Sequence, residues 1–191
     1  VWSMQLAPSW LEPAFAVRLP FMLLLVLTFL ATWHGVYYLA RSPRALPVVF
    51  AFGGEAHPKD YARSLADAGL LAFLACLGLA LPIHETTPMA MQLHGIAAVF
   101  AGAAILPFFS TRGLLIAWLG LLIMTLSGAP SLALILGLGC VFSWSKHPQS
   151  NKPQIWGMLL GLLCLLLLII EMDLWRWRIL SADELIKGWR E

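Results

Sequence analysis

Three histidines lie within or beside the apolar segments of the chain: His34, His84 and His94. Neutral imidazole nitrogens can ligate haem iron or the magnesium of a chlorophyll-type pigment between helices. A haem held by two of these histidines is disfavoured, because they are expected at different depths in the membrane. At about 1.5 Å of rise per residue, His84 lies about 7 Å shallower than His94, and His34 is expected in the opposite leaflet. We therefore predict no resident cofactor, and keep haem b or a chlorophyll-type pigment on these histidines as the alternative.

His94 lies about one and a half turns into the predicted helix 89–109, which carries no charged residue. An imidazole without a partner in hydrocarbon is costly. We therefore expect His94 to face the interior of the protein and to make a hydrogen bond to another helix, unless it ligates a cofactor.

Two other groups of residues have the side-chain types of metal ligands. Glu85 would join His84 and His94 in a zinc set, and the polar loop 53–61 carries Glu55, His57 and Asp60. This loop follows a Gly-Gly turn, and a solvated connection is the simpler interpretation. We predict no metal site.

Catalytic signatures are missing from the sequence. There is no GxSxG, HExxH, P-loop or GxGxxG pattern. The three cysteines lie in apolar segments without a CxxC partner, as expected of small buried side chains. No run of Lys or Arg is present that would follow a nucleic-acid backbone. We predict no catalytic residues and no nucleic-acid partner, and an enzyme is not the favoured interpretation.

The composition points to lipid as the solvent. Of 191 residues, 60% are hydrophobic and only 12% are charged, with a mean hydropathy of +0.82. Soluble domains carry roughly 25% charged residues. Because a chain in lipid must satisfy its backbone hydrogen bonds internally, we predict an all-α integral membrane protein.

A helix needs about 20 apolar residues to cross the hydrocarbon core. Four segments meet this length: 19–40, 65–83, 89–109 and 155–172. Segments 113–126 and 130–145 are shorter, and form either two short spans or a re-entrant hairpin. We favour two spans, which gives a six-helix bundle over 19–173. Residues 1–18 would be an amphipathic lead, and 174–191 an interfacial helix that starts with a capping-box pattern at 181–184.

Basic residues gather in alternate connections. The predicted connections after the first, third and fifth helices carry Lys and Arg, whereas 84–88 and 127–130 carry none. Cytoplasmic loops are enriched in these residues. The pattern predicts a multi-pass protein of a bacterial-type inner (plasma) membrane, with the basic loops cytoplasmic and both termini outside.

The third predicted helix carries small residues at packing intervals: Ala97, Ala98, Ala101 and Gly102. Small residues four apart let helix backbones approach closely in lipid. The chain also has nine tryptophans, several near the predicted interfaces, such as Trp156. These features favour a non-catalytic membrane subunit that packs into a larger complex through this helix and its Trp-rich ends. The partners would be the bilayer and other membrane subunits.

Two further functions stay open on the sequence. Between residues 89 and 145 the only charged side chain is Arg112. Ion-coupled carriers place ionisable groups inside the membrane, so this scarcity disfavours them. A transport component for a small neutral or apolar solute is one alternative. An electron-transfer subunit that holds haem b or a pigment is the other.

Overall fold

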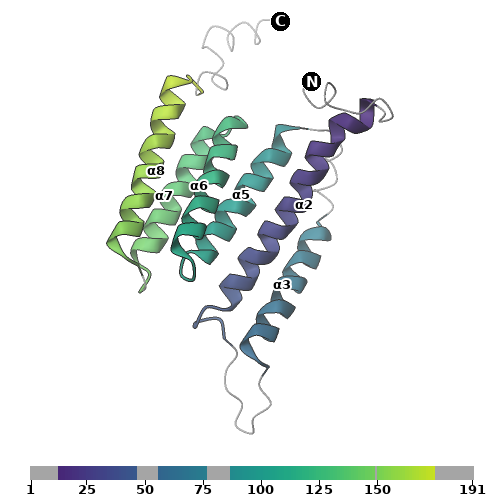
Figure 1. Cartoon of the computed structure of the whole chain (residues 1–191), viewed down its shortest axis with the longest axis vertical. Coiled ribbons are helices and arrows are strands. Elements are labelled where there is room, and N and C mark those ends of the chain that lie inside the picture. Colours follow the sequence, from purple (N-terminus) through teal and green to yellow (C-terminus); the bar gives the residue numbers. More distant parts are fainter. Residues whose placement is uncertain (1–12, 47–55, 77–86, 149, 175–191) are drawn as a thin grey trace, which may run out of the picture.

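The computed structural model describes residues 13–46, 56–76, 87–148 and 150–174. Within these residues the only regular secondary structure is α-helix, which confirms the predicted all-helical class. Six helices run side by side, up and down (Figure 1). They are α2 (Pro13–Ala40), α3 (Pro58–Leu74), α5 (Pro88–Ile105), α6 (Ser110–Leu126), α7 (Pro130–Ser145) and α8 (Lys152–Glu171).

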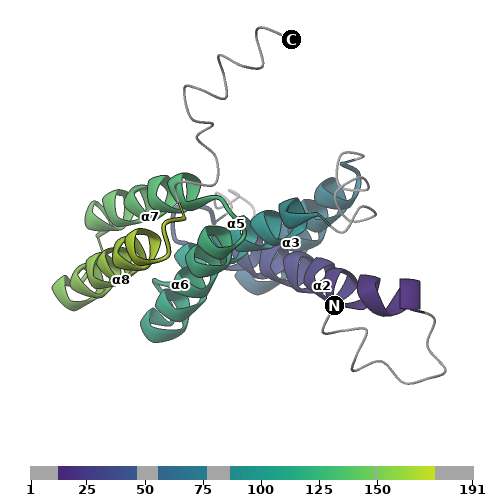
Figure 2. The same ribbon diagram turned by 90° about the horizontal axis from the view of Figure 1, so that it is seen from above.

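The helices form an open row. α5 packs between α2 and α6, α3 packs on the far side of α2, and α7 and α8 pack against α6 and against each other. The view from above shows the α7–α8 pair and the α2–α3 pair at opposite ends of this row (Figure 2). The arrangement is flatter than the compact six-helix bundle expected from the sequence, and long apolar faces remain uncovered on the outer helices.

Three helices are long and apolar enough to cross a membrane: Arg18–Ala40, Pro88–Ile105 and Lys152–Glu171, of 23, 18 and 20 residues. α6 and α7 are apolar but shorter, with 17 and 16 residues. The described part of α3 is more polar, and the segment predicted to span at 65–83 continues beyond the described residues. These three helices support the membrane class that the composition predicts.

Two helices, α2 and α3, begin six or seven residues earlier than the sequence analysis placed them. α2 starts at Pro13, so residues 13–18 belong to the helix and not to a separate lead. α3 starts at Pro58, and the polar stretch expected as a loop forms its first turns. Proline is favoured in a first turn because its missing N–H has no helical partner there. Asp60 and Arg63 also form a weak surface pair at 3.5 Å.

The turns between helices have local causes. The Nε1–H of Trp144 donates to Oε1 of Gln154 at 3.1 Å, which ties the end of α7 to the first turn of α8. Gly128 has a φ of 87°, a conformation that favours glycine, and it makes the turn between α6 and α7. Pro107 has no N–H to extend α5, which ends at Ile105 instead of Phe109. The C-terminal helix predicted over 174–191 lies almost entirely outside the described residues.

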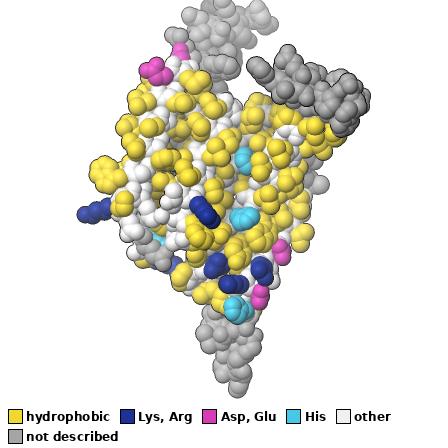
Figure 3. Space-filling model, viewed as in Figure 1, with side chains coloured by type: hydrophobic (Ala, Val, Ile, Leu, Met, Phe, Trp, Pro, Cys, Tyr) yellow, Lys and Arg dark blue, Asp and Glu magenta, His cyan; other side chains and the backbone are white. Residues whose placement is uncertain are grey.

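Aromatic rings and basic side chains meet at the end of the row that holds the α2–α3, α5–α6 and α7–α8 connections (Figure 1). The guanidinium of Arg41 lies 5.5 Å from the ring centre of Tyr37 and 5.3 Å from that of Phe108. The guanidinium of Arg112 lies 5.4 Å from the ring centre of Phe109. On the face shown in Figure 3, most Lys and Arg side chains lie in the lower half.

Candidate functional site

The contact between α2 and α5 holds two of the three buried polar side chains in the described residues. Thr28 is 1% exposed and His94 is 8% exposed, while the third, Thr125, bonds within its own helix. The small side chains of α5 bring the two helices close enough for Thr28 and His94 to meet. As expected, His94 faces inward and contacts a neighbouring helix, which is α2.

The positions of the hydrogens in the Thr28–His94 pair follow from the carbonyl oxygen beside it, which can only accept. Oγ1 of Thr28 lies 2.7 Å from the carbonyl oxygen of Leu24, which can only accept, so the single hydroxyl proton points there. Nδ1 of His94 lies 3.2 Å from the same Oγ1. Nδ1 must therefore carry a proton and donate it to Oγ1, which leaves the lone pair of the neutral ring on Nε2. The pair is arranged as an interhelical hydrogen bond.

A second polar link joins α5 to α6. The amide nitrogen of Gln92 donates to the carbonyl oxygen of Ser127 at 3.0 Å, where α6 ends. Gln92 and His94 therefore connect the first two turns of α5 to helices on both of its sides. These links fix the rotation and depth of α5, because the surrounding apolar side chains make no hydrogen bonds that could do so.

Glycines set the spacing between α5 and α6. A Cβ on Gly95 would lie 2.8 Å from the carbonyl oxygen of Gly120, and a Cβ on Gly102 would lie 2.5 Å from the backbone nitrogen of Ala117. On α6, a Cβ on Gly113 would lie 2.7 Å from the backbone of Leu106. No larger side chain fits at these crossings without separating the helices. Sequence reasoning missed Gly95, Gly113 and Gly120, although the seven-residue spacing of 95/102 and 113/120 was a usable signal.

The predicted packing residues are used within the chain. Ala97, Ala98, Ala101 and Gly102 are all buried. Gly102 faces α6, whereas Ala101 faces Gly35 of α2, whose added Cβ would lie 3.3 Å from the Cα of Ala101. These small residues serve contacts between α5 and its neighbours in the same chain, so they are not free to meet another subunit.

His34 stands apart from His94. It lies six residues after Thr28 on α2, about 9 Å further along the helix, and its side chain is exposed. Its Nδ1 lies 2.8 Å from the carbonyl oxygen of Leu30. The ring of Trp33 lies 5.1 Å away edge to face. The structure does not bring His34 and His94 together, and His84 lies outside the described residues.

The metal-ligand groups considered in the sequence do not assemble in the part of the chain that the structure describes. Glu55 and Glu85 lie outside it. His57 precedes the first turn of α3, and Asp60 faces Arg63. Among the described residues, no three His, Cys, Asp or Glu side chains gather closely enough to hold a metal ion.

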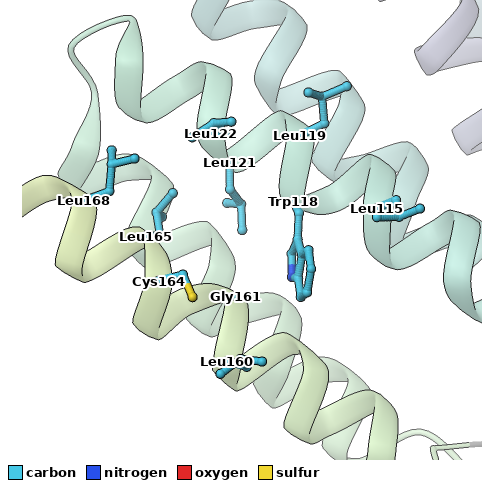
Figure 4. Close-up of a pocket in the computed structure, with 10 residues that line it drawn as sticks. All are labelled: Leu115, Trp118, Leu119, Leu121, Leu122, Leu160, Gly161, Cys164, Leu165 and Leu168. Atoms are coloured by element: carbon cyan, nitrogen blue, oxygen red, sulfur yellow. The ribbon is translucent and has the colours of Figure 1, made fainter.

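A groove between α6 and α8 was not expected from the sequence. It has a volume of about 470 Å³ and an almost wholly aliphatic lining (Figure 4). The indole of Trp118 reaches across from α6, and a Cβ added to Gly161 would overlap its Nε1. This nitrogen is buried and has no hydrogen-bond partner among the described residues. Gly161 therefore makes room for the indole.

Comparisons with protein-family models, with curated proteins and with solved structures find no match for this chain. The arguments about function therefore rest on the geometry of the described residues. Three features of that geometry matter most: the open row, the paired polar groups beside α5, and the exposed imidazole of His34.

Proposed function

We propose that the chain is a non-catalytic membrane subunit that crosses the bilayer six times and packs against other membrane proteins. The observation that carries this proposal is the open row of helices. An open row leaves much of its outer helices unburied, and these uncovered faces are apolar. Lipid can cover such faces, but packing against further helices adds the close contacts that stabilise membrane proteins.

The placement of polar groups supports a packing role. The buried side chains of Thr28 and His94 bond to each other, and Gln92 bonds to the backbone of α6. These bonds hold neighbouring helices at fixed depth. None of these three side chains lines the groove between α6 and α8, which is apolar.

The surface available to partners differs from the one expected. The small residues of α5 already face α2 and α6, so we place the partner contact on the outer face of α8. Trp156, Leu163 and Ile170 follow at intervals of seven residues on α8 and are 70%, 53% and 60% exposed. Large apolar side chains of this kind suit a second layer of helices.

Six crossings are favoured over a re-entrant hairpin. α6 starts where α5 ends and runs back along it, and α7 returns beside α6 and α8 (Figure 1). At 17 and 16 residues, α6 and α7 are about 25 Å long, which suits a short span with slight thinning of the bilayer. By the enrichment of Lys and Arg, we place the basic connections in the cytoplasm and both termini outside a bacterial-type inner membrane.

Native mass spectrometry of the protein extracted from its own membranes in a mild detergent tests this proposal. We expect a discrete assembly of fixed stoichiometry, heavier than the 21.0 kDa chain. Replacing Leu163 with Lys on the outer face of α8 should dissociate it, whereas the same change at Leu46, which is exposed beyond the end of α2, should not. A helical monomer under the same extraction would contradict the proposal.

A second candidate is a transport component for a small apolar solute, and the groove between α6 and α8 favours it. Its volume falls within the range typical of small-molecule sites. If the groove holds such a solute, a lipophilic molecule should co-purify with the protein. Cys164→Trp would fill the groove and should abolish that co-purification. Retention of the molecule by this variant would exclude the groove as its site.

A further inference from the structure

The outer face of α2 carries an apolar stripe that ends on a polar group. Val26, Leu30 and His34 follow at intervals of four residues and therefore share one side of the helix. Val26 is 52% exposed, Leu30 is 50% exposed, and the imidazole of His34 is exposed as well. An ionisable side chain at such a position in a membrane helix points to a function.

The hydrogen bond of His34 determines which ring nitrogen is available. Nδ1 lies 2.8 Å from the carbonyl oxygen of Leu30. A carbonyl oxygen has no proton to give, so Nδ1 carries the proton and donates it. Nε2 of the neutral ring then holds a lone pair on the side of the imidazole away from the backbone. Histidines that ligate metals are commonly held this way, with the other ring nitrogen bonded to a carbonyl group.

The surroundings of His34 fit a flat, apolar ligand with an anionic edge. Arg41 follows His34 by seven residues, which is two helical turns on the same side and about 10 Å along the axis. Its backbone N–H still bonds to the carbonyl of Tyr37 at 3.1 Å, so the helical path continues to this point. The guanidinium packs on the rings of Tyr37 and Phe108, and it has no carboxylate partner among the described residues.

We propose that His34 is the axial ligand of a haem-type iron porphyrin bound on the outer face of α2, with Arg41 binding its propionate groups. The lone pair of Nε2 forms the bond to iron. The macrocycle then lies flat along α2, over the exposed aliphatic side chains that precede His34. Its carboxylates point toward the basic end of the row. This proposal goes beyond membership of a complex and does not depend on it.

His94 cannot be the ligand of such a porphyrin. It is almost fully buried between α2 and α5, which leaves no space for a macrocycle beside its ring. Among the described residues no second histidine lies at the depth of His34, so the proposal assigns the iron one imidazole. A five-coordinate ferrous iron of this kind has an open position, and it should bind carbon monoxide.

The test is a titration of the full-length protein, purified without haem in detergent, with Fe-protoporphyrin IX. We expect a saturable Soret band, and a further shift of that band when carbon monoxide is added to the reduced complex. His34→Ala should weaken binding by at least about tenfold, because it removes the ligand itself. Free imidazole should restore the band in this variant. The matched control, His57→Ala, changes an exposed histidine outside the stripe and should bind as the unmodified protein does.

The dimethyl ester of the same porphyrin tests the contribution of Arg41. The unmodified protein should prefer the free propionates, and Arg41→Gln should lose that preference while still binding the ester. Equal binding by the unmodified protein and His34→Ala would overturn the proposal, as would the absence of saturable binding. Loss of binding in His57→Ala, or failure of imidazole to restore the band in folded His34→Ala, would also overturn it. None of these results bears on the mass of the native assembly.

Discussion

A hydroxyl group on α2 determines which ring nitrogen of a buried imidazole on α5 carries the hydrogen. The hydroxyl of Thr28 donates its hydrogen bond to the carbonyl oxygen of Leu24, so its oxygen can only accept from His94. The need for an interhelical partner was predictable from the position of His94 in an apolar segment. The identity of that partner was not, because threonine often bonds to the backbone of its own helix and gives no sequence signal of a contact.

Thr28→Val tests this pair at the scale of single residues. The change keeps the shape of the side chain but leaves the Nδ1–H of His94 without an acceptor. We expect the free energy of unfolding in detergent to fall by roughly 1 kcal/mol, the size of an interhelical hydrogen bond in a membrane protein. Thr32→Val is the matched control, since Oγ1 of Thr32 bonds only to the carbonyl of Thr28 in the same helix.

A double-mutant cycle with His94→Leu isolates the interaction. Either single change should remove most of the coupling, so that the second change costs less in the presence of the first. Strictly additive losses, or an equal loss in Thr32→Val, would show that the hydrogen bond contributes nothing specific.

At the scale of helices, the length of the apolar runs predicted which segments are helical, but it did not predict where the helices begin and end. Apolar runs of about 20 residues predicted α2, α5 and α8, because lipid selects for that length. The starts of α2 and α3 were missed, since their first turns carry polar or basic residues that look like loop. The close approach of α5 and α6 depends on glycines of the two helices that face each other. Their seven-residue spacing was visible within each segment, but which helix each glycine meets was not.

Gly120→Ala tests the close approach of α5 and α6. Its new Cβ would lie 2.7 Å from the carbonyl oxygen of Gly95 and 2.8 Å from the backbone nitrogen of Val99. Backbone atoms cannot move aside without separating the helices, so we expect a loss of about 1–3 kcal/mol in the free energy of unfolding.

The control for this change is Gly139→Ala on α7, where nothing lies within 4 Å of the added Cβ. Alanine favours helix over glycine by up to about 1 kcal/mol, so this variant should be as stable as the unmodified protein or more so. Thermal unfolding followed by circular dichroism compares the two. Similar effects at both glycines would mean that α5 and α6 are further apart than described.

At the scale of the whole molecule, the described residues form an open row with one basic end and one end at which few described residues are basic. Neither the row nor its flatness could be read from the sequence, because hydropathy gives the number of apolar segments and not which of them touch. The alternation of basic connections was readable, since it depends only on chain order. The same alternation carries the proposed orientation, on which the cytoplasmic and outer assignments of all connections depend.

Labelling of single cysteines in intact cells tests that orientation and the six crossings together. In a background without the three native cysteines, Ser131→Cys lies at the start of α7, beside the α6–α7 turn, and Ser42→Cys lies just beyond α2 at the basic end. We expect a thiol reagent that does not cross membranes to label Ser131→Cys in intact cells, and Ser42→Cys only after the cells are opened. If only Ser42→Cys is labelled from outside, the protein has the opposite orientation and the account is wrong. If Ser131→Cys is protected from both sides, α6 and α7 form a re-entrant hairpin and do not cross the membrane.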